Sequence, residues 1–285
     1  MQHLVFGASG QVGGAIVREL GAVGEAVAGT RYTGSDARYL RVDMTQENSV
    51  SEAFASVNPD IVWVPAALPN VDWCEEHPDD SWAVNVEGPV RVMEQARRDS
   101  LPLIFFSTDY VFDGTHGPYL ETDAVHPLQT YGQHKVEAEQ RLLHYDGTVV
   151  VRPAWIYSAE PMPRNFVFRV LQDLKHGRPI RALADQMNTP TPAAPMVRQA
   201  WQAVQDGFRG ILHLAGPERL SRLELVRRIA QLSGHDPAVV QSVGSHELSL
   251  PARRPLDGGL ATLFPRYAIQ DRLEDLDFSK LMQPS

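Results

Sequence analysis

Cysteine is almost absent from this chain of 285 residues, because Cys74 is its only one. No internal disulfide can therefore form, which fits a reducing compartment and predicts a cytoplasmic location. Long apolar runs are missing as well, and none approaches the length of a membrane span. We therefore expect no membrane partner. Since a strand is predicted directly after Met1, we also expect no signal peptide.

Positive charge is also scarce, with 26 Lys and Arg against 35 Asp and Glu and a net charge of −9. This balance argues against nucleic acid as a partner. The ten histidines show no metal-ligand spacing with cysteine or acidic residues, so we predict no metal site. The hydrophobic content of 43% is typical of a globular protein, and the length suffices for a main domain with a smaller companion.

A glycine-rich turn opens the chain, between an apolar strand at 2–6 and a helical pattern at 15–20. A dinucleotide-binding fingerprint requires this context, because glycines let the backbone approach a pyrophosphate at a helix N-terminus. The spacing here is G-x-x-G-x-x-G. Glycines at such spacing also occur in ordinary turns that bind no ligand. Its place after the first strand predicts cofactor contacts at Gly7, Ser9, Gly10, Gln11, Val12 and Gly13.

The next strands indicate which cofactor binds. Arg31 follows a second strand at 26–30, where NAD sites usually have an acidic residue and an arginine suits a 2′-phosphate. We therefore expect NADP(H) in preference to NAD(H), with an ordinary surface arginine as the alternative. A third strand at 39–43 ends in Asp43, which can accept a hydrogen bond from adenine or cap the helix that begins near residue 46. Met44, Ala66 and Ala67 complete the predicted cofactor contacts.

Three polar residues indicate the chemistry. Tyr131 and Lys135 are four apart, so on a helix they share a face, and Thr108 precedes them. A nearby ammonium favours phenolate, so we expect a lowered pKa for Tyr131 and a role as acid and base. A half-buried tyrosine beside a solvated lysine is the alternative, because the Tyr-x-x-x-Lys pattern is common. The glycine turn and Thr108 favour catalysis.

Alternating strand and helix signals predict an α/β protein with a Rossmann-type, doubly wound parallel sheet over residues 1–152. Thr108 then lies just past the carboxyl end of the fifth strand, at the edge where such sheets bind ligands. Residues 153–285, broken by prolines, are expected to form a smaller substrate-binding part, some of whose elements can return to the main sheet. Further strands are predicted at 61–64, 103–106, 149–151 and 211–214, and helices at 49–56, 79–98, 164–176, 196–206 and 221–233.

Several motifs resemble the extended short-chain dehydrogenase/reductases, and within them the dTDP-4-dehydrorhamnose reductase family. The resemblance runs from residue 2 to about 264. Its most specific part joins Ser-Thr-Asp-Tyr-Val-Phe-Asp-Gly at 107–114 to Tyr-Gly-Gln-His-Lys at 131–135. The other segments that carry it are 7–13, 70–75, 84–85, 118–123, 152–157, 165–166, 185–186 and 254–255.

The resemblance implies an NAD(P)-dependent oxidoreductase acting on a nucleotide sugar, with a homodimer left open. Tyr131 would protonate the C4 oxygen of a 4-keto-6-deoxy sugar linked to a nucleoside diphosphate. Thr108 would hydrogen-bond that oxygen, and Lys135 would hold the nicotinamide ribose. The implied substrate-binding residues are Asp109, Tyr110, Trp155, Asn165 and Arg254. Arg254 can neutralise the diphosphate, since guanidinium binds phosphate bidentately, or it can be a surface arginine.

Departures from the family pattern leave the sugar open. Asn188 stands where the family usually has glycine, and Pro65 stands where it usually has asparagine. Tyr110 replaces the acidic residue of the related 4,6-dehydratases, which disfavours dehydration. A nucleotide-sugar epimerase uses the same threonine, tyrosine and lysine and remains an alternative. The second alternative is a non-catalytic NADP-binding regulatory subunit, like that of methionine adenosyltransferase, which shares a motif very like 107–114.

Overall fold

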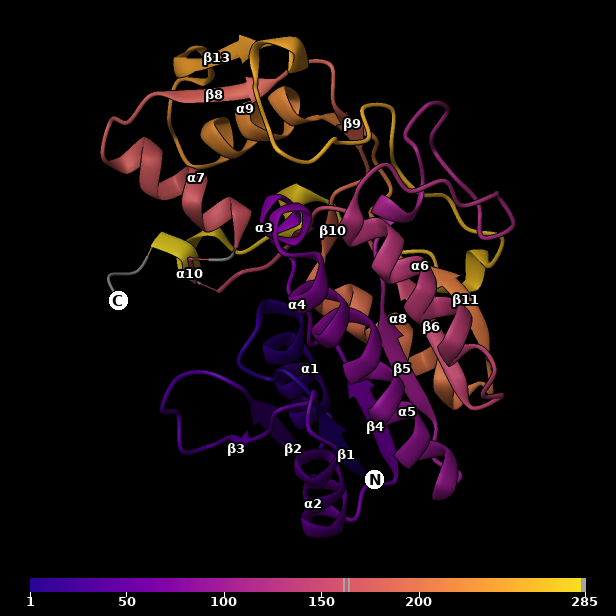
Figure 1. Ribbon diagram of the computed structural model, residues 1–285. Helices are drawn as coiled ribbons and strands as arrows, with labels where there is room; N and C mark the ends of the chain where they lie inside the picture. The colour runs from indigo at the N-terminus through magenta and orange to yellow at the C-terminus, as the bar shows by residue number, and fades with distance from the viewer. Residues whose placement is uncertain (161, 164, 283–285) are drawn as a thin grey trace.

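The computed structural model describes residues 1–160, 162, 163 and 165–282. At its centre lies a seven-stranded parallel sheet in the order β11-β6-β5-β4-β1-β2-β3 (Figure 1). The first six strands have the order of a Rossmann dinucleotide-binding fold, so the predicted fold class is confirmed. The strands are β1 (Gln2–Val5), β2 (Ala26–Arg31), β3 (Leu40–Arg41), β4 (Ile61–Val64), β5 (Leu103–Phe106), β6 (Thr148–Arg152) and β11 (Gly210–His213).

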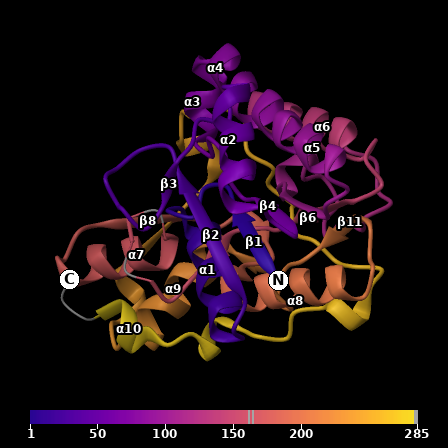
Figure 2. The same ribbon diagram turned by 90° about the horizontal axis from the view of Figure 1, so that it is seen from below.

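Helices cover both faces of this sheet, as Figure 2 shows from below. α1 (Gln11–Ala22) and α8 (Ala193–Gln205) pack on one face, in a core that includes Ile16 and Trp201. α2 (Glu47–Val57), α5 (Gly88–Arg98) and α6 (Thr130–Leu142) pack on the other. Because β4, β5 and β6 are buried on both faces, their sequences are unbroken apolar runs rather than alternating ones.

The predicted helix at 79–98 is interrupted. It consists of α4 (Pro78–Trp82), a π-helical turn at Ala83–Glu87 and α5. Pro89 has no N–H to donate to the carbonyl of Asn85, which favours a wider turn at this point. The turn leaves the Asn85 side chain buried and directed at the loop after β4, where it bonds the backbone of Leu68.

A smaller part lies beyond the carboxyl edge of the sheet (Figure 1). It contains three two-stranded sheets, β7 (Ile156–Tyr157) with β10 (Thr191–Pro192), β8 (Ile180–Leu183) with β13 (Val240–Val243), and β9 (Met187–Asn188) with β12 (Leu220–Ser221). α7 (Phe166–Lys175), α9 (Arg222–Leu232) and α10 (Phe278–Met282) pack with them around one core. The predicted helix at 164–176 corresponds to α7. Residue 164, the first of the predicted range, lies outside the described residues.

The chain does not stay in this smaller part after residue 153. α8 returns to pack against α1, and β11 pairs with β6 as the seventh strand. The chain therefore leaves the smaller part at α8, adds β11 to the main sheet and returns to the smaller part at β12. In the described ranges, no helix combines the length and the apolar character that crossing a bilayer needs.

Candidate active site

Close packing explains the glycines after β1. Gly7 has a φ of +85°, and a Cβ atom there would lie 2.9 Å from the Cα of Ala66. A Cβ atom on Gly13 would lie 2.2 Å from the Gly7 carbonyl oxygen. α1 begins after Gly10, which supplies no side-chain cap, so the first N–H groups of the helix are free for a phosphate. This cradle fits the pyrophosphate of a dinucleotide.

The other predicted turn residues flank this cradle. Gln11 donates from Nε2 to the Ser158 hydroxyl at 3.1 Å, which ties the first turn of α1 to the segment after β7. Ser9 is exposed at the turn, whereas Val12 packs against the core of its face. Ala66 contacts Gly7 from the end of β4, and Ala67 follows it.

Arg31 and Asp43 both interact with their own loops. The Arg31 guanidinium donates to the carbonyl of Asp36 at 2.9 Å and to that of Gly34. Asp43 Oδ1 accepts from the N–H and hydroxyl of Thr45, at 2.9 and 2.7 Å. Asp43 therefore caps the turn that leads into α2, whose own N-cap is Gln46. Met44 is buried beside Gly88.

The candidate catalytic residues lie in one region at the carboxyl end of β5, because the turn Asp109–Val111 that follows Thr108 packs against α6. Thr108 caps a short turn, its Oγ1 accepting from the N–H of Tyr110 at 3.2 Å. Tyr131 and Lys135 lie in the first two turns of α6, and the Lys135 ammonium is 5.9 Å from the Tyr131 ring centre. Lys135 Nζ donates to the Phe106 carbonyl at 2.8 Å, so its position is fixed. All three side chains are buried.

Burial changes the acidity of this group in a way that the spacing did not predict. Burial raises the pKa of Tyr131 well above its ordinary value, and the neighbouring Cys74 and Asp109 add to the increase. Burial also lowers the pKa of Lys135 to about 7, against the influence of Glu139. The predicted lowering of the Tyr131 pKa is therefore wrong, because burial of the phenol itself disfavours the phenolate. A phenol that stays protonated suits a proton donor.

Asp109 is buried next to Thr108 and is held by a residue that the motifs did not assign to the site. Asn188 Nδ2 donates to Asp109 Oδ2 at 2.6 Å, and the Thr108 hydroxyl donates to Oδ1 at 3.3 Å. Burial raises the pKa of Asp109 to about 6, while the Asn188 hydrogen bond and the charge of Arg222 oppose this rise. Asn188 was noted only as a departure from the family pattern. Its contact joins β9 to the loop after β5.

Trp155 has a strained backbone, with a φ of +34° that residues other than glycine rarely adopt. Its indole Nε1 is buried with no hydrogen-bond partner in the part of the chain that the structure describes. The guanidinium of Arg222 lies 3.6 Å from the centre of the Trp155 ring. The sequence motifs do not include Arg222, and its position at the start of a predicted helix carries no signal of a site.

Two predicted substrate residues have partners within the fold. Asn165 is the N-cap of α7 and donates to the carbonyls of Ser158 and Glu160, at 2.6 and 2.9 Å. Arg254 forms an ion pair with Asp72 at 2.7 Å and donates to the Ala252 carbonyl at 2.6 Å. The ion pair with Asp72 attaches the segment that contains Arg254 to α3 (Val71–Glu76). Their predicted contacts with substrate remain predictions.

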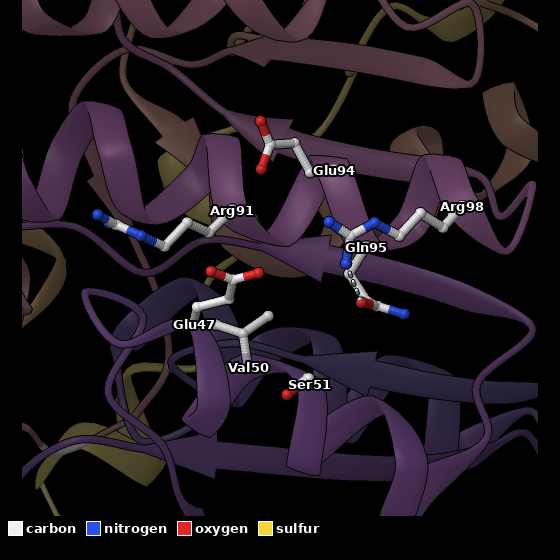
Figure 3. A pocket seen from close by; sticks show the side chains of 7 residues that line it. All are labelled: Glu47, Val50, Ser51, Arg91, Glu94, Gln95 and Arg98. Atoms are coloured by element: carbon white, nitrogen blue, oxygen red, sulfur yellow. Dashed lines mark hydrogen bonds between the residues drawn. The ribbon is translucent and has the colours of Figure 1, made fainter.

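Two hollows lie away from this group. One, between α2 and α5, has a volume of about 10 Å³, which is room for about one water molecule (Figure 3). Its lining is mostly charged and polar side chains, among them Glu47, Arg91 and Arg98. The other, of about 340 Å³, is lined by residues that include Thr189, His213 and Ile269. Over the described ranges, no group of three or more His, Cys, Asp and Glu side chains could hold a metal ion.

Comparison with known proteins settles the family. A family model described as RmlD substrate binding domain matches residues 1–266. The chain belongs to this family. It is 30% identical to the probable low-salt glycan biosynthesis reductase Agl14 of Haloferax volcanii over 263 residues, covering 90% of this chain and 88% of the relative.

Further RmlD-family relatives agree with this assignment. The dTDP-4-dehydrorhamnose reductase of Mycolicibacterium smegmatis is 32% identical over 256 residues, which cover 88% of this chain and 75% of the relative. A crystal structure of a dTDP-4-dehydrorhamnose reductase from Clostridium acetobutylicum is 29% identical with a TM-score of 0.82, covering 94% of this chain and 91% of the other. The predicted resemblance to extended short-chain dehydrogenase/reductases of this type is thereby confirmed.

Proposed function

We propose that this protein is an NADP-preferring reductase of a nucleotide-linked 4-keto-6-deoxy sugar, similar to the dTDP-4-dehydrorhamnose reductases. The burial of Thr108, Tyr131 and Lys135 at the carboxyl edge of the parallel sheet, the edge at which the glycine turn follows β1, carries the proposal. The three relatives discussed above, at about 30% identity, bear reductase names, and two of them are dTDP-4-dehydrorhamnose reductases by name. Arg31, at the end of β2, supports NADP over NAD.

The chemistry needs one hydride and one proton. Bound NADPH would supply the hydride, which adds to the carbonyl carbon C4 of the sugar as the C4=O π bond becomes a C–O single bond. Tyr131 donates its phenolic proton to that oxygen, so the product is an alcohol and the tyrosine is left as phenolate. The Thr108 hydroxyl, which donates to Asp109 Oδ1 in the free protein, turns to donate to the same oxygen and stabilises its developing charge. The Lys135 ammonium then stabilises the phenolate until a proton returns from solvent.

The direct test is the oxidation of NADPH in the presence of dTDP-4-dehydrorhamnose, with NADH run in parallel. We expect turnover that is faster with NADPH. No turnover with several 4-keto sugar nucleotides, combined with tight NADPH binding, would reject the reductase and favour a regulatory binding role. Turnover that interconverts sugar epimers without net NADPH oxidation would identify an epimerase.

Replacement of Tyr131 tests the proton donor. Tyr131→Phe should reduce kcat by at least ~100-fold, because general acid catalysis is lost. NADPH affinity should stay near that of the wild type, since only one hydroxyl is removed. The matched control is Tyr145→Phe, which removes a hydroxyl that bonds the Leu101 carbonyl and should leave kcat unchanged. A fully active Tyr131→Phe enzyme would reject the mechanism.

A further inference from the structure

Arg222 is a cation close enough to Asp109 for each to influence the pKa of the other, although the two form no ion pair. It is the first residue of α9, and its backbone N–H donates to the Gln186 carbonyl at 2.9 Å. Among the described residues, no carboxylate forms an ion pair with its guanidinium and no acceptor bonds it. Arg254, the residue that the motifs favoured for a diphosphate, is by contrast paired with Asp72.

Two aromatic rings hold this guanidinium in place. Its central carbon lies 3.6 Å from the ring centre of Trp155 and 4.5 Å from that of Phe166. Burial lowers the pKa of Arg222 to about 10, so the side chain keeps its charge at neutral pH. A guanidinium that stacks through its face leaves the N–H groups along its edge available to a ligand. The arrangement therefore presents a fixed, charged donor with unused hydrogen bonds.

The surroundings of Arg222 favour an anion. Arg169 of α7 lies 5.9 Å from the centre of the same Phe166 ring, so two cations share this aromatic residue. Asp109 and Tyr110 are close enough for the charge of Arg222 to influence the pKa of each. The Asp109 carboxylate already accepts from Asn188, on β9, which pairs with the strand that leads into Arg222. A ligand that carries negative charge would compensate both arginines.

We propose that Arg222 binds the diphosphate of the nucleotide-linked sugar, an inference that rests on the proposed function. In a pyranose, C1 and C4 lie at opposite ends of the ring. With C4 at Tyr131 and Thr108, the diphosphate on C1 must therefore lie away from the catalytic group. Arg222 provides a cation in the smaller part, and a guanidinium binds phosphate oxygens bidentately. The Trp155 ring, on which this guanidinium stacks, is itself a predicted substrate contact, so ring and arginine would bind the substrate side by side.

Calorimetric titration of dTDP, with thymidine as the phosphate-free ligand, tests this assignment without any turnover. Arg222→Gln should weaken dTDP binding about 10- to 100-fold, as expected for charge-assisted hydrogen bonds, and leave thymidine binding unchanged. Arg227→Gln is the matched control, because Arg227 is an exposed arginine of the same helix whose Nη2 bonds the Val240 carbonyl. It should bind dTDP like the wild type. Unchanged dTDP affinity in Arg222→Gln would overturn the proposal.

A measurement on the unmodified protein covers the case in which Arg222→Gln does not fold. Phenylglyoxal modifies arginine side chains, and mass spectrometry of the digested protein reports the modified fraction at Arg222. We expect dTDP to protect Arg222 while thymidine does not. Equal modification with and without bound dTDP would reject the assignment.

The outcomes separate this proposal from the reductase assignment. A wild-type protein that reduces no 4-keto sugar but binds dTDP through Arg222 would lose the proposed activity and keep the diphosphate site. A wild-type protein that reduces the sugar, with a KM that Arg222→Gln leaves unchanged, would lose only the diphosphate site. Failure of dTDP, UDP, GDP and CDP alike to bind would overturn the diphosphate site.

Discussion

Replacing Asp109 with asparagine should stabilise the protein at neutral and alkaline pH. Asp109 is only 6% exposed, and its two oxygens accept from Asn188 and Thr108. Burial raises its pKa from an ordinary 3.8 to about 6. The folded state therefore prefers the protonated acid, and ionisation carries a cost that the unfolded chain does not have. Asparagine has nearly the same shape and no charge, and the Thr108 hydroxyl can rotate to accept from its amide.

The sign and the size follow from linkage. A group whose pKa is raised on folding supports the folded state fully below its unfolded pKa and loses that support as pH rises through its folded pKa. The loss for Asp109 falls between pH 3.8 and about 6. A difference of about two between the pKa values corresponds to about 3 kcal/mol of unfolding free energy. Asp109→Asn should gain about this amount at about pH 8 and almost nothing at about pH 4.

Urea denaturation of both proteins across this pH range measures the difference in unfolding free energy. The control is Asp113→Asn, because Asp113 accepts from the Tyr119 hydroxyl at 2.6 Å and that contact holds its pKa below the ordinary value. The control should lose stability at high pH, opposite in sign to Asp109→Asn. If Asp109→Asn gave the same gain at low and high pH, ionisation of the buried acid would not be its cause.

Two further substitutions test the core and the cofactor. Glu139→Gln should cost about 3–5 kcal/mol in urea denaturation, because it leaves the buried Arg152 charge without its 2.5 Å partner; Glu137→Gln, in an exposed pair with Arg141, should cost less than about 1 kcal/mol. A small loss of unfolding free energy in Glu139→Gln would mean that water stabilises the Arg152 charge. Arg31→Ala should raise the KM for NADPH at least ~10-fold and leave that for NADH unchanged. Equal changes in the KM for NADPH and the KM for NADH would contradict the prediction that Arg31 binds the 2′-phosphate of NADPH.

Sequence predicts the main sheet well because its signals are local. β4, β5, the end of β1 and most of β6 are apolar runs followed by helical patterns, and right-handed crossover connections then leave few arrangements. β11 and α8 were harder to place, because pairing of β11 with β6 joins Gly210 to Val149, far apart in the chain. The π-helical turn in the predicted helix 79–98 was not foreseen either, although Pro89 marks the place.

The candidate site shows the same contrast between residues that local patterns predict and residues that only long-range packing brings together. Thr108, Tyr131 and Lys135 were predictable from the end of one strand and a four-residue helical spacing. The Asn188–Asp109 bond spans 79 residues of sequence, and Arg222 meets Trp155 only through packing of the smaller part. The pKa of Tyr131 depends on burial by all of these segments. Spacing alone therefore gave the right partner, Lys135, and the wrong direction of the pKa change.

Asp109 and Lys135 are buried in this site and Arg222 is partly buried, although burial disfavours the charge of each. Burial raises the pKa of Asp109 to about 6 and lowers those of Lys135 and Arg222 to about 7 and about 10. The fold also has the buried pair of Glu139 and Arg152, in which each charge compensates the other. The three groups of the site form no ion pair among the described residues; Asp109 and Arg222 favour each other's charge, but burial outweighs this and reduces the stability of the free protein. The proposed ligands would compensate these charges: the nucleotide sugar would bring an anion for Arg222, and the sugar and cofactor would bring hydroxyl groups for Asp109 and Lys135.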